Sequence, residues 1–146
     1  MPNPLIQQVL TLYERFDPAL IAALDQIYHT DIVFEDPVHR VQGLIDLRRY
    51  FSRLVRGLDE CRFEFSDVLD QAGRDGESNQ AVLFWTMYYR HPKLQGGKLL
   101  TLAGSSHLKY SERVLYHRDY FDVGAMLYEQ LPLLGRVIHA IKKRLG

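Results

Sequence analysis

Two short acidic stretches hold the residues whose types are best suited to chemistry. Residues 35–38 read Glu-Asp-Pro-Val, and residues 117–122 read His-Arg-Asp-Tyr-Phe-Asp. Each stretch sets an aspartate, Asp36 or Asp119, among apolar and aromatic neighbours. A carboxylate surrounded by apolar side chains tends to have a raised pKa, which lets it act as a general base near neutral pH. We therefore expect the two aspartates to line one pocket in which acid–base chemistry takes place.

Each aspartate also has a purely structural interpretation. Asp36 precedes Pro37, which favours extended backbone, so it can equally be a turn residue at the end of a strand. Asp119 lies in the middle of a predicted strand, where aspartate is disfavoured, and a buried pair with an arginine or a histidine is the alternative to a pocket role. His117 shares a strand face with Asp119, so it would either tune this carboxylate or simply hydrogen-bond to it.

Aromatic and apolar side chains supply the expected walls of the pocket. Tyr13 lies on the apolar stripe of the first predicted helix, where it is either a hydrogen-bond donor to a ligand or a core tyrosine with a satisfied hydroxyl. Strand alternation directs a further set of side chains inward, where we expect them to contact the ligand. These are Phe34, Trp85, Met87, Tyr89, Leu102, Ser106 and Phe121.

The sequence gives no sign of a metal or a cofactor. The histidines at positions 29, 39, 91 and 139 lack metal-ligand spacing, and Cys61 is the single cysteine, so no zinc site and no disulfide within the chain are expected. A glycine-rich phosphate loop, a nucleophile elbow and a dinucleotide fingerprint are also missing. We therefore expect a cofactor-free protein.

Length and charge exclude several classes of protein. The 146 residues fit one domain, residues 1–146, with 47% hydrophobic and 25% charged residues. Eighteen basic residues balance eighteen acidic ones, so the overall charge gives no reason to expect a nucleic-acid partner. No signal peptide is visible, and no apolar stretch approaches the roughly 18 residues of a membrane span. A soluble, cytoplasmic protein is the default expectation.

The elements that must position these residues follow from hydrophobic periodicity. Spacings of three and four predict helices near residues 5–16, 18–27 and 44–58, with a short strand at 31–36 between the last two. Four arginines of the third helix lie largely off its apolar stripe: Arg48, Arg49, Arg53 and Arg56. Alternation predicts four long strands, at 61–69, 80–91, 98–110 and 113–122. This order indicates an α+β fold in which a curved antiparallel sheet wraps around helices and leaves a conical cavity.

Helical spacing returns at the end of the chain. Leu127 to Leu145 follow a helical pattern that Pro132 interrupts, which predicts two short helices or a kink. The basic residues of this segment complement the helix dipole, while its apolar stripe closes the cavity or packs in a dimer. We favour this interpretation over contact with an anionic membrane surface.

The order of elements, together with residues 35–38 and 118–122, resembles the nuclear transport factor 2-like, or SnoaL-like, superfamily. The resemblance implies a cystatin-like cone with a curved sheet around the N-terminal helices and a C-terminal capping helix. In the steroid Δ-isomerase branch, a Glu-Asp-Pro-Val run carries the proton-shuttling aspartate, which matches Asp36. Those enzymes have an oxyanion-binding tyrosine on their first helix, and Tyr13 lies within about one residue of the matching position. Ser106 stands where those enzymes have a protonated aspartate.

Two further branches resemble the C-terminal stretch. Limonene-epoxide hydrolases share an Arg-Asp-Tyr-Phe-Asp run whose first aspartate activates water, which matches Asp119. Trp85 and Met87 stand where those enzymes carry an arginine and an acid. Polyketide-cyclase relatives imply an acid–base role for a late-strand aspartate near Asp119 or Asp122.

Two functional hypotheses follow. The first is a cofactor-free isomerase, hydrolase or cyclase that acts on a small apolar molecule of steroid-, terpene- or fatty-acid-like type, with Asp36, Asp119, Tyr13 and His117 as its catalytic residues. The second is a non-catalytic domain that binds a ligand or pairs with another chain. A homodimer is the expected assembly.

Overall fold

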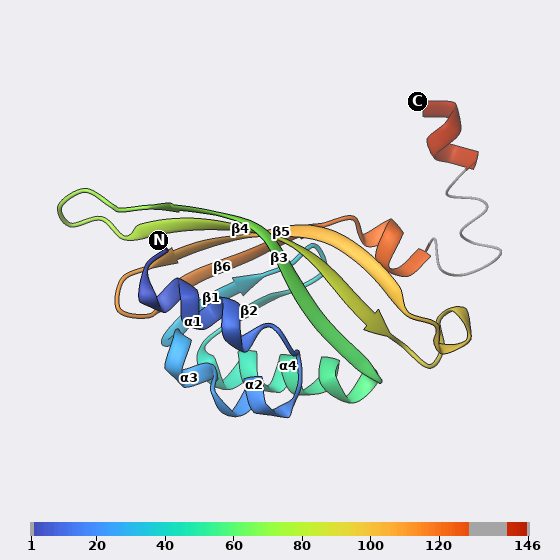
Figure 1. Ribbon diagram of the computed structural model, residues 1–146, viewed down its shortest axis with the longest axis horizontal. Helices are drawn as coiled ribbons and strands as arrows, with labels where there is room; N and C mark the ends of the chain where they lie inside the picture. The colour runs from blue at the N-terminus through green and yellow to red at the C-terminus, as the bar shows by residue number, and fades with distance from the viewer. Residues whose placement is uncertain (1, 129–139, 146) are drawn as a thin grey trace.

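A curved sheet covers four short helices in the computed structural model, which describes residues 2–128 and 140–145 (Figure 1). Helices α1 (Pro4–Leu12), α2 (Pro18–Ala22), α3 (Leu24–Ile27) and α4 (Leu44–Gly57) lie on the concave side of the sheet. The sheet contains β1 (Tyr28–Glu35), β2 (Arg40–Gln42), β3 (Glu60–Gln71), β4 (Asn79–Arg90), β5 (Leu100–Tyr110) and β6 (Val114–Phe121). The predicted α+β cone and its four long strands are therefore confirmed, whereas a single domain over residues 1–146 stays a prediction.

Local sequence signals explain how the first helices begin. The Asn3 side chain accepts a hydrogen bond from the backbone nitrogen of Leu5 (2.8 Å), and Pro4 follows at the first helical position. Asp17 caps α2 in the same way, again with a proline next. Side-chain oxygens at these positions satisfy backbone N–H groups that have no partner inside the helix. The predicted helix at 18–27 is in fact divided at Ala23 into α2 and α3.

The strand order is β2-β1-β6-β5-β4-β3. Consecutive strands from β3 to β6 pair antiparallel, but β1 and β6 run parallel, so the sheet is mixed and the prediction of a wholly antiparallel sheet is wrong in this respect. The reason is topological. The chain leaves β1 through β2 and α4, crosses the helical layer and returns strand by strand, so that β6 reaches the free side of β1 in the same direction. The alternation of apolar and polar residues within one strand does not show that β1 pairs with β6 or in which direction.

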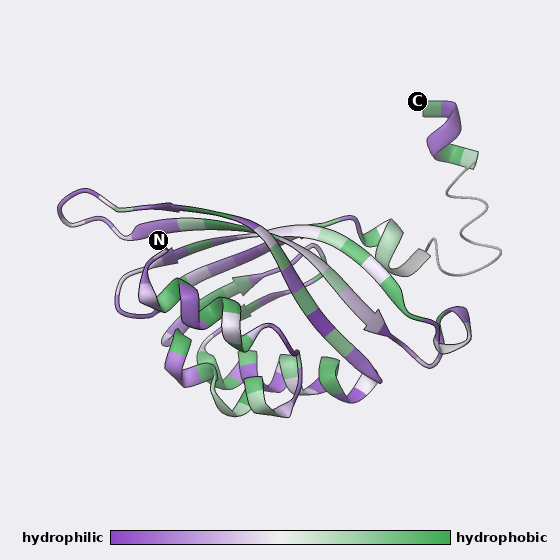
Figure 2. Ribbon diagram, in the orientation of Figure 1, coloured by the Kyte–Doolittle hydropathy of each residue, from purple (hydrophilic) through white to green (hydrophobic). Residues whose placement is uncertain are grey.

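The core lies between the concave face of the sheet and the helices. Hydrophobic and hydrophilic residues alternate along the strands (Figure 2), and the inward members, such as Leu83, Leu102 and Leu108, are buried. A register shift between Phe65 and Asp67 interrupts the pairing of β3 with β4. Irregularities of this kind bend a strand and increase its twist, which helps the sheet to curve around the helices.

The C-terminal prediction is tested in part. Residues Gly124–Tyr128 form a π-helical turn, and residues 140–145 are helical and exposed. The predicted break at Pro132 and the closing of the cavity by this segment lie outside the described residues. Among the described residues, no helix is long and apolar enough to cross a membrane.

Gly104 has a definite reason to be glycine. It lies opposite Trp85 in the β4–β5 register, and the indole ring lies directly over its backbone. The inward side of β5 is therefore flat at this point, and the large ring fills the space that a side chain would occupy.

Replacing Gly104 by alanine should lower the free energy of unfolding by about 1–3 kcal/mol, the usual cost of overpacking a core. A Cβ atom there would lie 2.3 Å from Cη2 of Trp85, so the ring would have to move. Urea denaturation measures the change. Gly57→Ala is the matched control, because its Cβ atom meets nothing within 4 Å; equal stability of the two variants would contradict the prediction.

Candidate functional site

An apolar cavity of about 230 Å³ lies between the helices and the concave face of the sheet. Both predicted aspartates, Asp36 and Asp119, line it. Its other walls are mostly aromatic and aliphatic side chains from α4 and from strands β1, β3, β4, β5 and β6. The volume is below the range usual for drug-sized ligands, which indicates a small ligand or the apolar part of a larger one.

Asp119 is held by two donors on the same oxygen. Ser106 lies directly across from it in the β5–β6 register, and the Ser106 hydroxyl is 2.5 Å from Asp119 Oδ1. His117, two residues earlier on the same face of β6, brings Nε2 to 2.6 Å from that atom. Among the described residues, Oδ2 accepts no hydrogen bond, so half of this carboxylate remains available to the cavity.

A second layer of hydrogen bonds fixes these two donors. Trp85 Nε1 lies 2.8 Å from the Ser106 hydroxyl oxygen. An indole N–H can only donate, so the serine hydroxyl accepts from Trp85 and gives its own hydrogen to Asp119. The flat surface that Gly104 provides beneath the indole is what allows this approach.

On the other side, His117 is joined to two buried tyrosines. Its Nδ1 is 2.7 Å from the hydroxyl of Tyr28, which in turn is 2.5 Å from the hydroxyl of Tyr13. Burial, with a smaller effect of the Asp119 charge, raises the pKa of each tyrosine well above its ordinary value. Both hydroxyls therefore keep their protons and remain hydrogen-bond donors.

The direction of the whole chain follows from the carboxylate. With Asp119 ionised and His117 neutral, Nε2 carries the hydrogen that faces the carboxylate, so Nδ1 accepts from Tyr28 and the Tyr28 oxygen accepts from Tyr13. Protonation of His117 would reverse the direction of both tyrosine hydrogen bonds, because Nδ1–H would then donate to Tyr28 and the Tyr28 hydroxyl would donate to Tyr13. Tyr13 would in that case turn its O–H group toward the cavity that it lines.

Asp36 is bound more completely. One oxygen accepts from the backbone nitrogens of Val38 (2.8 Å) and His39 (2.7 Å), and the other accepts from the Tyr50 hydroxyl. The Tyr50 hydroxyl also lies 3.2 Å from His39 Nδ1. The pKa of the Tyr50 hydroxyl is raised mainly by burial and, to a smaller extent, by the Asp36 carboxylate. Asp36 therefore closes the turn that follows β1 and also contributes to the cavity wall.

The predicted ligand contacts fall into two groups. Phe34, Trp85, Met87, Tyr89, Leu102 and Phe121 line the main cavity. Ser106 lies behind it, in a much smaller space of about 10 Å³ that Tyr13, His117, Trp85 and Asp119 also border. Ser106 thus reaches the cavity through Asp119 rather than directly.

Two tyrosines that hydrogen-bond to His117 and Asp36 were not predicted from the sequence. Tyr28 lies at the start of β1, three residues before the predicted strand, where a register shift against β6 breaks the alternation. Tyr50 lies beside Phe51 in α4. Its spacing of three residues from Leu47 was the available sign that it lies on the buried side of the helix. Within the described residues, no group of three or more histidine, cysteine, aspartate or glutamate side chains could hold a metal ion.

The family model for the SnoaL-like domain matches residues 9–113. The chain belongs to this family. The resemblance expected from the sequence is thereby confirmed, although the matched segment ends before the strand that holds His117 and Asp119. No curated protein sequence matches this SnoaL-like chain.

Solved structures agree with the fold. A candidate SnoaL-like polyketide cyclase from Shewanella denitrificans is 21% identical, with 89% of this chain and 98% of that chain covered and a TM-score of 0.70. A Catenulispora acidiphila protein with a ketosteroid isomerase-like fold is 10% identical, with coverages of 89% and 93% and a TM-score of 0.69. TerC, crystallised with polyporic acid, is 18% identical, with coverages of 85% and 95% and a TM-score of 0.68. At these identities the likeness shows the fold alone.

Replacing Tyr28 by phenylalanine should lower the free energy of unfolding by about 1–3 kcal/mol, because His117 Nδ1 and the Tyr13 hydroxyl both lose a buried partner. Thermal and urea denaturation measure this loss. Nitrogen-15 NMR of the His117 ring should also report a changed tautomer balance. Tyr120→Phe is the control, since that ring is 48% exposed; a similar loss of stability in both variants, with no change at His117, would rule out the proposed hydrogen-bond chain.

Proposed function

We propose that this SnoaL-like domain binds a small, mostly apolar molecule in its cavity and carries out cofactor-free acid–base chemistry on it, with Asp119 as the general base. One observation carries the proposal. Asp119 faces an apolar cavity with one oxygen held by two hydrogen-bond donors and the other free of partners among the described residues. A general base needs this arrangement of a fixed carboxylate with an accessible lone pair.

The neighbours of Asp119 have distinct roles in this proposal. Ser106 and His117 orient the carboxylate and stabilise its charge. Tyr13 lines the same cavity, and when His117 is protonated its O–H group can donate to a ligand oxygen on which negative charge develops. A base that removes a proton and a donor that stabilises the resulting oxyanion are the two parts that isomerase-, hydrolase- and cyclase-type reactions require.

Asp36 has a different role in the same proposal. Both of its oxygens already accept hydrogen bonds, so a proton from the ligand would have to replace one of them. We infer that Asp36 shapes the cavity beside Tyr50 and contributes to the electric field there, while the proton transfer occurs at Asp119.

The comparisons favour a small organic ligand. TerC was crystallised with polyporic acid, and several structural neighbours are candidate polyketide cyclases. Because the identities are low, they support the ligand class only by analogy. The apolar lining and the free oxygen of Asp119 carry the argument for this chain.

Asp119→Asn should reduce turnover by roughly 10²- to 10⁴-fold, the contribution expected of a positioned general base. The assay follows a panel of small apolar compounds with exchangeable C–H groups by hydrogen–deuterium exchange and product analysis. Asp75→Asn, in the exposed β3–β4 turn, makes the same charge change far from the cavity and should leave turnover unaltered. If Asp119→Asn binds and converts ligand like the wild type, the catalytic proposal is wrong.

The alternative of an interaction domain has its own support. Phe84, Ser105 and Tyr120 lie in one row across three neighbouring strands, on the sheet face away from the helices. Phe84 is 37% exposed and Tyr120 is 48% exposed. Two exposed aromatic rings on an open sheet face are suited to pack against a second copy of the same surface, which supports the expected homodimer.

Phe84→Asp should convert such a dimer to a monomer, because a charge would be buried in an apolar contact. Light scattering after size exclusion measures the mass over a range of concentrations. Ile45→Asp is the control, since Ile45 is 69% exposed on α4, away from the row. A wild type that is monomeric at every concentration would exclude the homodimer.

A further inference from the structure

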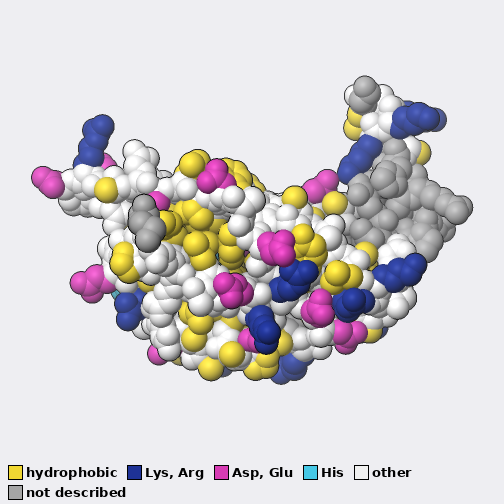
Figure 3. All heavy atoms as spheres, in the orientation of Figure 1, with side chains coloured by type: hydrophobic (Ala, Val, Ile, Leu, Met, Phe, Trp, Pro, Cys, Tyr) yellow, Lys and Arg dark blue, Asp and Glu magenta, His cyan; other side chains and the backbone are white. Residues whose placement is uncertain are grey.

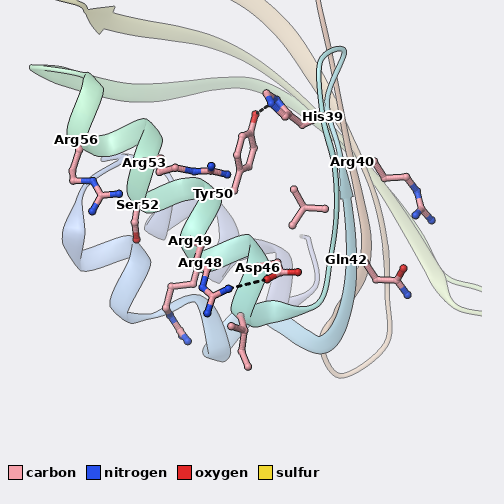
Figure 4. Close-up of a pocket in the computed structure, with 12 residues that line it drawn as sticks. His39, Arg40, Gln42, Asp46, Arg48, Arg49, Tyr50, Ser52, Arg53 and Arg56 are labelled. Atoms are coloured by element: carbon pink, nitrogen blue, oxygen red, sulfur yellow. Dashed lines mark hydrogen bonds and ion pairs between the residues drawn. The ribbon is translucent and has the colours of Figure 1, made fainter.

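A wide groove runs along α4 on the surface, between this helix and the segment from His39 to Gln42 (Figure 4). Its volume is about 920 Å³. Five arginines line it, namely Arg40, Arg48, Arg49, Arg53 and Arg56, and among the described lining residues Asp46 is the one acidic side chain. The chain as a whole has no net charge, and charges of both signs are intermixed on the face seen in Figure 3. Arg40 pairs with Glu35 at 3.0 Å, so the excess of positive charge in the groove comes from the four arginines of α4.

Three of these arginines form a stripe on the helix. Arg49, Arg53 and Arg56 are spaced by four and three residues along α4, so they lie on one side of it, and all three are exposed. Arg49 lies 3.7 Å from Asp46, but both side chains are largely exposed, and such pairs hold an arginine only weakly. The stripe is therefore free to bind an external anion.

The groove and the apolar cavity meet at two residues. His39 and Tyr50 line both. Arg53 extends from α4 toward Tyr50 (Figure 4), and its positive charge partly offsets the rise in the pKa of the Tyr50 hydroxyl. Among the described residues, Asp36 forms no ion pair with Arg53; its carboxylate accepts from two backbone nitrogens and from Tyr50 and lies 3.9 Å from His39 Nδ1.

We propose that the natural ligand is an acid: its apolar body fills the cavity, and its carboxylate, sulfonate or phosphate group passes Tyr50 and binds Arg53 and Arg49 in the groove. This inference rests on the proposed function and makes it more specific. It selects amphiphilic acids, such as fatty-acid-like molecules, over neutral steroids and terpenes. Arginine suits this task because its planar guanidinium group binds oxyanions through paired hydrogen bonds.

Two matched fluorescent probes separate the acid group from the apolar body. 1-Anilinonaphthalene-8-sulfonate and N-phenyl-1-naphthylamine share the same rings, and only the first carries a sulfonate. Titration of each probe into the protein, at low and at high salt, gives its dissociation constant. High salt should weaken binding of the sulfonate probe but not of the neutral probe, since salt screens the exposed arginines.

Arg53→Gln should weaken binding of the sulfonate probe by about tenfold, the loss expected for one charge-assisted hydrogen-bonded contact. The dissociation constant of the neutral probe should change by less than about twofold. Arg49→Gln should act in the same direction. Arg74→Gln, in the β3–β4 turn, removes the same charge elsewhere and should change neither probe. Circular dichroism confirms that each variant is folded.

Filling the cavity tests whether the two subsites belong to one ligand. Met87→Trp, or Leu54→Trp if the first variant does not fold, places a large ring in the lining and should weaken both probes while the arginines stay intact. If the sulfonate probe binds these variants as tightly as the wild type, the groove binds anions on its own and the proposal is wrong.

Two other outcomes are also decisive. If both probes bind the wild type and Arg53→Gln and Arg49→Gln change neither, the acid-group inference fails while the proposed ligand-binding function stands. If neither probe binds, the proposed apolar ligand fails together with the inference.

Discussion

A carboxylate can stay charged in an apolar cavity only if hydrogen bonds replace the water that it has lost. Asp119 meets this requirement through Ser106 and His117, and each of these is fixed in turn by a buried aromatic residue, Trp85 or Tyr28. The chain of bonds crosses four strands, so it forms only when the sheet has its native register. The position of the Asp119 carboxylate and the fold therefore depend on the same set of contacts.

The pairing of strands shows how strict this dependence is. Ser106 faces Asp119 because β5 and β6 are in one particular register, and a shift of either strand by one residue would put the two side chains on opposite faces of the sheet. The parallel contact between β1 and β6 has a similar effect, since it brings the start of β1, with Tyr28, to His117. A wholly antiparallel sheet with β1 elsewhere would leave His117 Nδ1 without this partner.

Much of the site was predictable from the sequence, for a physical reason. Alternation within a strand states which side chains share a face, and this was sufficient to direct His117, Asp119 and Phe121 inward together. It does not state which strands pair or in which register, so the contact of Ser106 with Asp119 and the parallel β1–β6 pair could not be derived from it. The strand β2, with three residues, is too short to show any period.

The missed tyrosines have a similar explanation. Tyr28 lies at the start of β1, before the register shift between Tyr28 and Val33. The alternation of inward and outward residues that marks the rest of the strand therefore does not extend to it. Its role depends on a partner 89 residues away, and only the folded chain brings the two together. Tyr50 was hidden for a different reason, because an amphipathic helix makes every apolar residue on its stripe resemble core.

The distribution of charge around the cavity argues for one orientation of a bound acid. Two carboxylates, Asp36 and Asp119, line the cavity, while the exposed arginines of α4 line the groove that shares His39 and Tyr50 with it. An acid group inside the cavity would be repelled by both carboxylates at low dielectric, where repulsion is strongest. The same group in the groove would be attracted by Arg49 and Arg53. In the proposed complex the acid end would therefore stay in the groove, and the apolar end of the molecule would be the part that reaches Asp119.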